Sequence, residues 1–262
     1  MRLHRFIGKF DLNQNDLLIE DKELISQINK VLRLKSGDRI ILSDGNSNEA
    51  LAEIQNEPAE KGRKFGKTPG VKDAPTPGVE ENFRPRKSGT LIIKIIERYK
   101  NESEPIKKVK LYCAVLKKEN FELVVQKATE AGVSEIIPII TERTVKTNLN
   151  IERLQKITKE AAEQSGRGII PILHEPIKFE QAIEQAKKNN QKNILFDKSG
   201  IPLLTTNYLL LTAVGIFVGP EGGFSESEVS FAKENGFQIA SLGLLTLRAE
   251  TAAIISTYII SQ

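Results

Sequence analysis

A glycine-rich loop toward the carboxyl end of the chain is the segment best suited to hold a small ligand. Residues 219–223 read GPEGG and follow an apolar run at 216–218, which predicts a strand that ends at the loop. Ser225 precedes Glu228 by three residues, the spacing of a capping box, so a helix is expected to begin directly after the loop. The segment has the strand, loop and helix order typical of ligand-binding turns in parallel sheets.

A second loop follows in the same arrangement. The apolar run 237–242 ends at Gly243, and Arg-Ala-Glu-Thr-Ala at 248–252 opens a final apolar helix. Because strands that alternate with helices form parallel sheets, we expect the two loops to meet at the carboxyl edge of one sheet. Glycines there let the backbone hold a flat heterocycle between main-chain N–H and C=O groups. By itself GPEGG is also an ordinary turn sequence, and the second loop is what favours a ligand site.

Spacing argues against several familiar sites. GPEGG has neither the G-x-G-x-x-G pattern of a dinucleotide site nor the G-x-x-x-x-G-K-[ST] pattern of a P-loop. Residues 66–68 read Gly-Lys-Thr, but Lys61 stands where the first P-loop glycine belongs, so a nucleoside triphosphate enzyme is disfavoured. With one cysteine, Cys113, and two histidines, we expect no bound metal and no internal disulfide.

Length and charge allow an RNA partner without requiring one. The 262 residues suffice for two domains, and the net charge is +4 with an isoelectric point near 9.0. The amino terminus lacks the apolar core of a signal peptide. Thr212 and Gly215 interrupt the apolar run at 209–218, which is too short to cross a membrane. We therefore expect a soluble, cytoplasmic protein with no membrane partner.

The first domain is expected over residues 1–103 and should be rich in strands. An alternating strand at 30–35, a Ser-Gly-Asp turn at 36–38 and strands at 39–43, 49–55 and 91–99 are predicted. Residues 57–89 read as a basic insertion rich in glycine and proline. Within it, residues 61–87 hold eight basic and three acidic side chains. We interpret this segment as a solvated loop, and the alternative is an arm that grips RNA phosphates.

The second domain is expected over residues 104–262. Its first strand is predicted at 110–116, and the apolar spacing from Phe121 predicts a helix that stops at Gly132. Asn150 is the expected cap of the following helix. Cys113 lies in the apolar strand and is interpreted as a packing residue.

Five segments carry a resemblance that covers most of the chain. GPEGGFS at 219–225 and LG-x-x-x-LRAETA at 242–252 are joined upstream by KKENFELVVQKATEAGV at 117–133, IIPIITERT at 136–144 and EAAEQSGR at 160–167. Together they resemble the uridine-N3 methyltransferases of bacterial 16S ribosomal RNA, the ribosomal RNA small subunit methyltransferase E family of the SPOUT superfamily. The chain departs from this family at Leu245, where members usually carry arginine.

The resemblance implies a fold and partners as well as an activity. The expected fold is α/β, with a parallel sheet and a carboxyl-terminal trefoil knot, preceded by a small PUA-like β-barrel. The expected cofactor is S-adenosyl-L-methionine, and the substrate is N3 of a uridine in 16S ribosomal RNA of the small subunit. A homodimer is implied, with the site near the subunit interface, across which Arg143 and Arg167 would act.

Uridine methylation requires that N3 lose its proton before it attacks the methyl group. The anion that results is stabilised by a cation or by fixed donors, and Arg167 is the first candidate because an arginine stays protonated. A surface arginine at a helix end is the alternative reading of Arg167. Glu163 and Glu250 are the candidate bases, and the residues alone do not decide between them.

The family implies cofactor-binding residues, and basic side chains, each of which alone could be an ordinary solvated charge, are the candidates for RNA contacts. The residues expected at the cofactor are Leu195, Phe196, Gly219, Pro220, Glu221, Gly222, Leu242, Gly243, Leu247, Arg248, Ala249, Thr251 and Ala252. The residues expected at the RNA are Arg5, Lys30, Arg33, Arg143 and Arg167.

Two other functions stay open at this point. One is an RNA-binding ribosome-assembly factor whose methyltransferase site is silent. The other is a SPOUT methyltransferase that acts on a different nucleotide or on a 2′-hydroxyl. Methyl transfer and the identity of the methylated nucleoside would separate the three.

Overall fold

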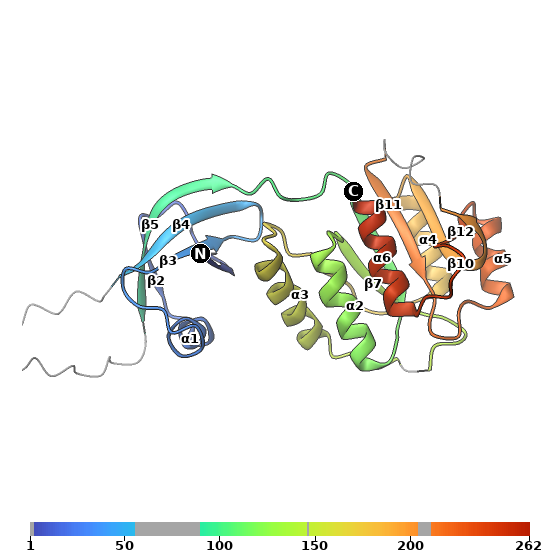
Figure 1. Cartoon of the computed structure of the whole chain (residues 1–262), viewed down its shortest axis with the longest axis horizontal. Coiled ribbons are helices and arrows are strands. Elements are labelled where there is room, and N and C mark those ends of the chain that lie inside the picture. The colour runs from blue at the N-terminus through green and yellow to red at the C-terminus, as the bar shows by residue number, and fades with distance from the viewer. Residues whose placement is uncertain (1–2, 56–89, 146, 204–210) are drawn as a thin grey trace, which may run out of the picture.

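The computed structural model describes residues 3–55, 90–145, 147–203 and 211–262, which form two sheets side by side (Figure 1). The insertion predicted at 57–89 lies outside the described residues. The first sheet has the order β1-β3-β4-β5-β2, with β1 and β3 parallel and the other neighbours antiparallel. Its elements are β1 (His4–Ile7), β2 (Asp16–Ile19), α1 (Lys22–Ser26), the π-helical turn η1 (Gln27–Val31), β3 (Arg39–Ser43), β4 (Asn48–Gln55) and β5 (Leu91–Lys100).

The local predictions for this sheet hold except at one segment. The strands predicted at 39–43, 49–55 and 91–99 are β3, β4 and β5, and Gly37 in the predicted turn has a φ of +89°. The strand predicted at 30–35 is wrong, because η1 occupies its beginning and no strand follows until Arg39. Ile28 and Leu32 turn toward the core at helical spacing, so packing overrides the alternating pattern.

The second sheet is parallel and has the order β12-β10-β11-β6-β7-β8, with β9 also paired to β7. A parallel sheet in an α/β fold was predicted, and the structure confirms it. The elements are β6 (Lys108–Ala114), α2 (Lys118–Glu130), β7 (Glu135–Ile140), α3 (Ile151–Ser165), β8 (Ile172–Leu173), β9 (Ile177–Lys178), α4 (Phe179–Asn189), β10 (Lys192–Pro202), β11 (Ala213–Val218), α5 (Glu226–Glu234), β12 (Gln238–Ser241) and α6 (Ala249–Ser261).

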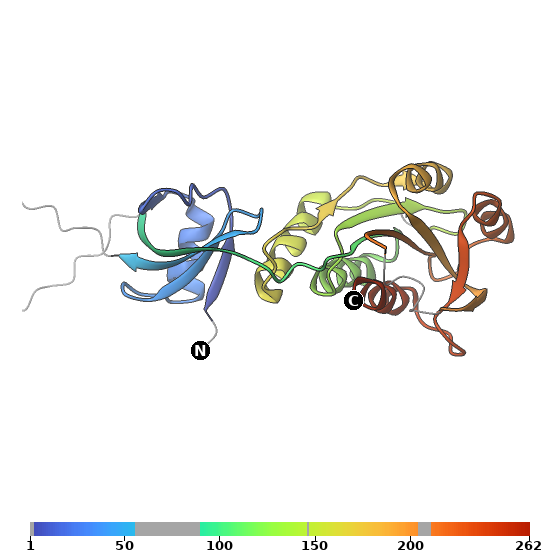
Figure 2. The same cartoon turned by 90° about the horizontal axis from the view of Figure 1, so that it is seen from above.

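Helices cover both faces of this sheet (Figure 2). Alternate residues of β6 point to opposite sides, so Leu111 and Cys113 join a core with α2, α3 and α6, while Tyr112 joins a core with α4 and α5. The Tyr112 ring stacks on Phe217 with centroids 4.3 Å apart. Burial on both faces explains why β6 and β11 are nearly continuous apolar runs.

The two sheets are joined through α3 and the connection after β5. The backbone N–H of Ile7 in β1 donates a 2.8 Å hydrogen bond to Glu163 Oε1 on α3. Asn101 Nδ2 donates to both Glu49 Oε1 and the carbonyl of Gly166, at 2.8 and 3.0 Å. These contacts fix α3 against the first sheet, and this sheet lies at the end of the molecule opposite α5 (Figure 1).

Candidate functional site

The topology of the second sheet makes the carboxyl ends of β6 and β11 a candidate ligand site, which we call the crevice. These strands are neighbours, and Cys113 is in register with Val218 at their carboxyl ends. The chain leaves β6 for α2 on one face and leaves β11 for α5 on the other. Ligands of parallel sheets bind where neighbouring connections diverge in this way. The glycine loop 219–223 starts at this point.

The glycine loop is shaped by its own sequence. Gly223 has a φ of +71°, a left-handed conformation, and its N–H donates a 2.8 Å hydrogen bond to the carbonyl of Pro220. A Cβ on Gly219 would lie 3.1 Å from both the backbone nitrogen and the ring of Phe224. The predicted capping box is confirmed, since Glu228 Oε2 accepts from the Ser225 N–H at 2.8 Å. The loop is therefore a fixed turn with main-chain groups at its surface.

Arg143 holds this loop from the strand two places away. Its Nη1 donates to the carbonyls of Gly222 and Phe224, at 2.8 and 3.3 Å. Beside it, the N–H of Glu142 donates a 2.9 Å bond to Glu228 Oε1. The sequence prediction assigned Arg143 to RNA, and this loop-holding contact was not foreseen because the partners are about eighty residues apart.

The second predicted loop reaches the same crevice through α6. Gly243 has a φ of +127°, and the loop that follows leads into α6 at Ala249. Ala249 and Ala253 pack in one core with Cys113 and Val218, so the start of α6 is held against the ends of β6 and β11. The structure thus brings the two predicted loops to the carboxyl edge of the sheet, beside the same two strand ends.

Glu250 is buried at this edge without a full set of partners. Glu250 is 7% exposed, and its Oε2 has no hydrogen-bond partner among the described residues. Oε1 lies 4.0 Å from Nη1 of Arg248, whose own side chain is 87% exposed. Burial raises the pKa of the Cys113 thiol, and the negative charges of Glu221 and Glu250 raise it further. The thiol is therefore held neutral, and both carboxylates lie close enough to act on it.

The other residues expected at the cofactor contribute mainly backbone. Leu195 and Phe196 end the regular part of β10, and both side chains are buried in the cores. Leu242 and Leu247 are half-buried, and Thr251 and Ala252 lie in the first turn of α6. A heterocycle at this edge would meet main-chain groups between apolar side chains, the surroundings typical of cofactor pockets.

Arg167 lies at the other end of the sheet. Its guanidinium donates to both carboxylate oxygens of Glu104, at 2.7 and 3.3 Å. Nη1 also donates to the carbonyls of Thr129 and Val133, where α2 ends, at 3.1 and 2.6 Å. Because α2 begins at the carboxyl edge and ends at the amino edge, Arg167 is separated from the glycine loop by the length of that helix. Within one chain, the structure does not bring it to the crevice.

Glu163 is also remote from the crevice. Its Oε1 accepts the hydrogen bond from Ile7 at the contact between the two sheets. Burial raises the pKa of this carboxyl group, against the opposing effects of the Ile7 N–H and Lys159. Of the two candidate bases, only Glu250 lies beside the predicted loops.

The residues predicted to bind RNA differ in availability. Lys30 and Arg33 are exposed, in and just after η1, where Arg33 has a φ of +55°. Arg5 is paired with Glu49 at 3.0 Å and is half-buried. Lys30 and Arg33 are therefore the two members of the predicted set whose exposed charge has no partner among the described residues.

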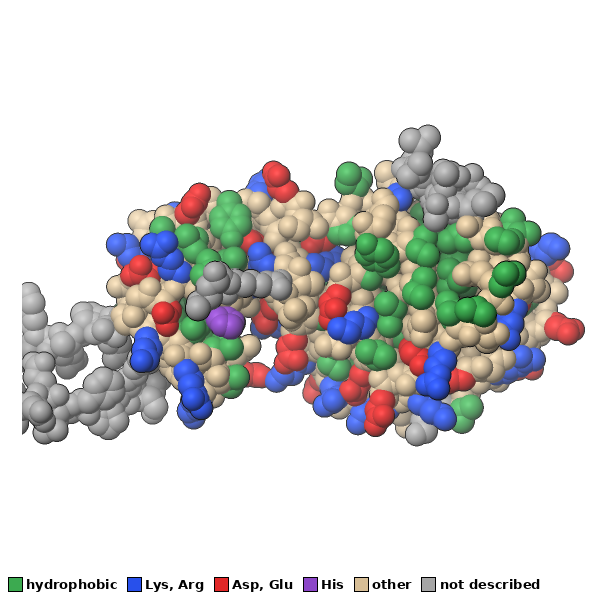
Figure 3. All heavy atoms as spheres, in the orientation of Figure 1, with side chains coloured by type: hydrophobic (Ala, Val, Ile, Leu, Met, Phe, Trp, Pro, Cys, Tyr) green, Lys and Arg blue, Asp and Glu red, His purple; other side chains and the backbone are tan. Residues whose placement is uncertain are grey.

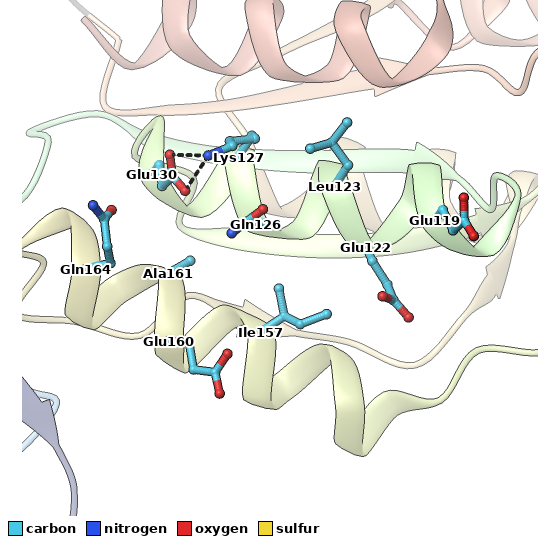
Figure 4. Close-up of a pocket in the computed structure, with 10 residues that line it drawn as sticks. All are labelled: Glu119, Glu122, Leu123, Gln126, Lys127, Glu130, Ile157, Glu160, Ala161 and Gln164. Carbon is cyan, nitrogen blue, oxygen red and sulfur yellow. Dashed lines mark hydrogen bonds and ion pairs between the residues drawn. The ribbon is translucent and has the colours of Figure 1, made fainter. Parts of the chain in front are cut away.

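A separate cavity of about 710 Å³ lies between α2 and α3 (Figure 4). Glu119, Glu122, Glu130 and Glu160 line it, with Lys127 as the one basic side chain among its lining residues. Lys127 Nζ is bonded to both carboxylate oxygens of Glu130, at 2.9 and 3.0 Å. The excess of carboxylates makes this surface unfavourable for phosphate groups.

The described residues hold neither a metal-binding cluster nor a membrane-spanning helix. No group of three His, Cys, Asp or Glu residues with metal-binding geometry occurs in the parts of the chain that the structure describes. Among those same residues, none of the helices is long and apolar enough to span a membrane.

Comparison with known proteins defines the class. The RNA methyltransferase domain family matches residues 102–261, and the RNA methyltransferase PUA domain family matches residues 28–61. The chain is thus an RNA methyltransferase that carries a PUA domain. More narrowly, it belongs to the ribosomal RNA small subunit methyltransferase E family, as its motifs predicted.

Individual relatives support this assignment. The chain is 38% identical to the ribosomal RNA small subunit methyltransferase E of Mesomycoplasma hyopneumoniae over 61% of this chain and 72% of the relative. It is 31% identical to that of Rickettsia conorii over 88% of this chain and 83% of the relative. A solved structure from Legionella pneumophila, described as a methyltransferase with the bound cofactor SAM, superposes with a TM-score of 0.79 at 27% identity, over 99% of this chain and 97% of the other.

Proposed function

We propose that this protein transfers the methyl group of S-adenosylmethionine to N3 of a uridine in 16S ribosomal RNA of the small ribosomal subunit. The observation that carries the proposal is the meeting of the two glycine-containing loops at the diverging ends of β6 and β11, in a chain of this family. We further propose that residues 1–103 form the PUA-like RNA-binding domain and residues 104–262 the methyltransferase domain.

The two loops offer main-chain groups to the cofactor. The main chain of Gly219 to Gly222 and of Leu242 and Gly243 would hold the adenosine part, because glycines let a flat ring approach the backbone closely. Arg143 keeps that main chain in place through the carbonyl of Gly222. The cofactor supplies a methyl group that its sulfonium has already activated. The task of the chain is then to align the uracil with it, and such positioning contributes roughly 7 to 11 kcal/mol.

The placement of the charged residues divides the expected roles. We propose that Arg167 stabilises the end of α2 and the link to Glu104 rather than the uracil anion, because its donors are engaged there. We propose that Glu163 fixes the contact between the two sheets. Glu250 then remains as the acidic side chain of the reaction site, and main-chain N–H groups of the loops are the nearest fixed donors for the anion.

We also propose that the protein acts as a homodimer through α6. Ile255 and Tyr258 lie on one face of α6 and are 37% and 57% exposed, and Leu244 and Leu245 in the preceding loop are more exposed still. Figure 3 shows hydrophobic side chains gathered over this part of the molecule. An apolar face of this kind is typical of an interface between subunits. A second copy on α6 would lie next to the crevice, because the same helix starts there.

The proposed trefoil knot rests on the path of the last segment. β12 is the edge strand of the sheet, yet the helix that follows it, α6, packs on β6 and β11 in the middle of the sheet and on α2. The connection at 242–248 must therefore cross the ends of β10 and β11. Most connections in proteins are unknotted, so a knot here would be an exception to the general rule.

The reaction is tested directly with labelled cofactor. Purified protein is incubated with methyl-labelled S-adenosylmethionine and small ribosomal subunits that lack the modification, and the digested RNA is examined by mass spectrometry. Label in 3-methyluridine is expected. Subunits that already carry the modification serve as the control and should take up no label.

The other outcomes lead to the two alternatives. Label in a different nucleoside, or on a 2′-hydroxyl, would replace the proposed target and keep the methyltransferase activity. Cofactor binding without label in any small-subunit RNA would favour an assembly factor with a silent site.

A further inference from the structure

Glu250 is in an unusual position for a carboxylate. It is the second residue of α6, a helix of 13 residues, and it is more than nine-tenths buried where that helix meets the ends of β6 and β11. Oε2 has no hydrogen-bond partner among the described residues. A buried charged oxygen without a partner is costly, so a native structure that keeps one usually pairs it with a ligand or water.

The Glu250 carboxylate lies at a helix start and has no cationic group among the described residues within hydrogen-bond distance. The amino-terminal end of a helix carries a partial positive charge and stabilises an anion placed there. The nearest cation is Arg248, but Nη1 lies 4.0 Å from Oε1, beyond hydrogen-bond distance, and its side chain is mostly in solvent. Oε2 is thus left for a group that the protein does not itself supply.

Glu221 adds a second negative charge at the same edge. It belongs to the glycine loop, and its charge and that of Glu250 both act on Cys113. The N–H of Lys117 lies 3.4 Å from Glu221 Oε1, which offsets little of that charge. Two carboxylates at a site that must also admit RNA phosphates would repel the substrate unless a cation lay between them.

We propose that the Glu250 carboxylate binds a positively charged group of S-adenosylmethionine. The inference rests on the proposed function and assigns to Glu250 cofactor binding rather than acceptance of the uracil N3 proton. S-adenosylmethionine carries two cationic groups, the sulfonium and the α-ammonium. S-adenosylhomocysteine keeps only the ammonium, and 5′-methylthioadenosine has neither. A carboxylate engaged with either cation is a poor proton acceptor, because the cation stabilises its charged form.

The three compounds distinguish the two cationic groups in binding experiments without RNA. Isothermal titration calorimetry is performed with each compound on the wild type and on Glu250→Gln, which keeps the shape and removes the charge. The variant should bind S-adenosylmethionine about 10- to 100-fold more weakly, as expected for one lost charge-assisted contact, and 5′-methylthioadenosine with unchanged affinity. A loss confined to S-adenosylmethionine assigns the sulfonium. An equal loss for S-adenosylhomocysteine assigns the ammonium.

Two results overturn the proposal. One is unchanged affinity of Glu250→Gln for S-adenosylmethionine. The other is an equal loss for 5′-methylthioadenosine, which would mean that the substitution had damaged the pocket. If Glu250→Gln does not fold, the affinities of the wild type provide the test. The proposal requires the wild type to bind S-adenosylmethionine at least about 10-fold more tightly than 5′-methylthioadenosine. Equal affinities would then refute the proposal.

A matched variant and a stability measurement separate this role from a structural one. Glu152 is the second residue of α3, as Glu250 is of α6, but it is exposed, so Glu152→Gln removes the same charge at a helix start and should leave cofactor affinity unchanged. Without cofactor, Glu250→Gln should melt no lower than the wild type, because an unpaired buried charge has been removed. Glu250→Asp should restore part of the affinity.

The outcome is also separable from that of the proposed function. A wild type that binds S-adenosylmethionine with the predicted dependence on Glu250, yet methylates no ribosomal RNA, would retain this inference and lose the function. A wild type that binds none of the three compounds overturns the inference.

Discussion

Arg167 and Glu250 are both buried charged residues, but their charges are satisfied to different degrees. The guanidinium of Arg167 meets a carboxylate and two carbonyls of its own chain, whereas Glu250 Oε2 meets none among the described residues. Buried charges that serve the fold are normally paired. At the scale of the residue, this difference separates a structural charge from one available to a ligand.

Arg167→Ala is expected to lower stability without reaching the cofactor. It breaks the buried pair with Glu104 and removes the bonds to the carbonyls of Thr129 and Val133, so the free energy of unfolding should fall by about 3 kcal/mol. Urea denaturation measures this change. Arg153 forms a comparable two-bonded pair with Glu122 but is 57% exposed, so Arg153→Ala should cost less than about 1 kcal/mol. A stable Arg167→Ala that has lost methyl transfer would return Arg167 to the reaction.

Arg143→Ala should affect the cofactor first and RNA second. Without its bonds to the carbonyls of Gly222 and Phe224, the glycine loop loses its support from the end of β7. The affinity for S-adenosylmethionine should fall about 10-fold, because the main chain of the loop is no longer held in place, while the free energy of unfolding should fall by less than about 1 kcal/mol because Arg143 is exposed. Calorimetry on the variant measures the former. Unchanged cofactor affinity together with weaker RNA binding would show that Arg143 contacts phosphate, as the sequence alone had indicated.

Local sequence predicted the residues that act on near neighbours. Asn150 caps α3 by accepting from the Arg153 N–H, and Gly132 ends α2 with a φ of +95°, both as expected. Such signals span three or four residues and need no tertiary information. The partner of Arg167 is 63 residues away, and no spacing rule connects Arg167 with Glu104. Its proposed place in the reaction therefore rested on the family motif alone.

At the scale of the element, α3 links the two sheets through Glu163. The helix packs on β1, and the Ile7 N–H donates to the Glu163 carboxylate in a partly buried contact. Burial raises the pKa of Glu163 above the usual 4.5, so the folded chain holds this proton more tightly than the unfolded chain. Glu163 therefore contributes most to the free energy of unfolding when the pH is below its pKa in the unfolded chain. This contribution declines as the pH rises through the raised pKa of the folded chain.

Glu163→Gln should remove this decline. Glutamine still accepts the hydrogen bond from Ile7 but carries no charge, so the free energy of unfolding of the variant minus that of the wild type should increase from about pH 4 to neutral pH. Denaturant titrations across this range give the difference. Glu152→Gln, on the same helix but exposed, should show no such trend. A difference that is flat or falls with pH would mean that Glu163 is not protonated more readily in the folded state.

Helices and strands could be predicted from the sequence where the apolar pattern fits only one kind of element. The apolar runs that became β6 and β11 are buried on both faces, and the sequence identified them correctly. Residues 30–35 alternate as a strand would, yet η1 forms there because Ile28 and Leu32 pack into the first core at helical spacing. Short alternating segments do not distinguish these outcomes, since the deciding contacts come from the rest of the sheet.

At the scale of the whole molecule, the apolar face of α6 determines the expected assembly. The loop before α6 carries Leu245 where the family usually has arginine, and that side chain is 83% exposed. Together with Ile255 and Tyr258 it extends an apolar surface along the helix whose first turn holds Glu250. A dimer built on this face would bring a second chain to each crevice, so assembly and cofactor binding should be coupled.

Tyr258→Asp should convert the proposed dimer to monomers. A carboxylate in the middle of an apolar interface would be buried without a partner, which should weaken association by about 100-fold. Light scattering after size-exclusion chromatography, at micromolar protein, would show the change in mass. Leu18→Asp is the matched control, because Leu18 is 60% exposed in β2 of the first sheet, at the opposite end of the molecule from α6 (Figure 1). If the wild type is itself a monomer, or if Tyr258→Asp stays dimeric, the interface is not on α6. If the monomeric variant binds S-adenosylmethionine as well as the wild type does, the crevice is complete within one chain and the partner serves only the RNA.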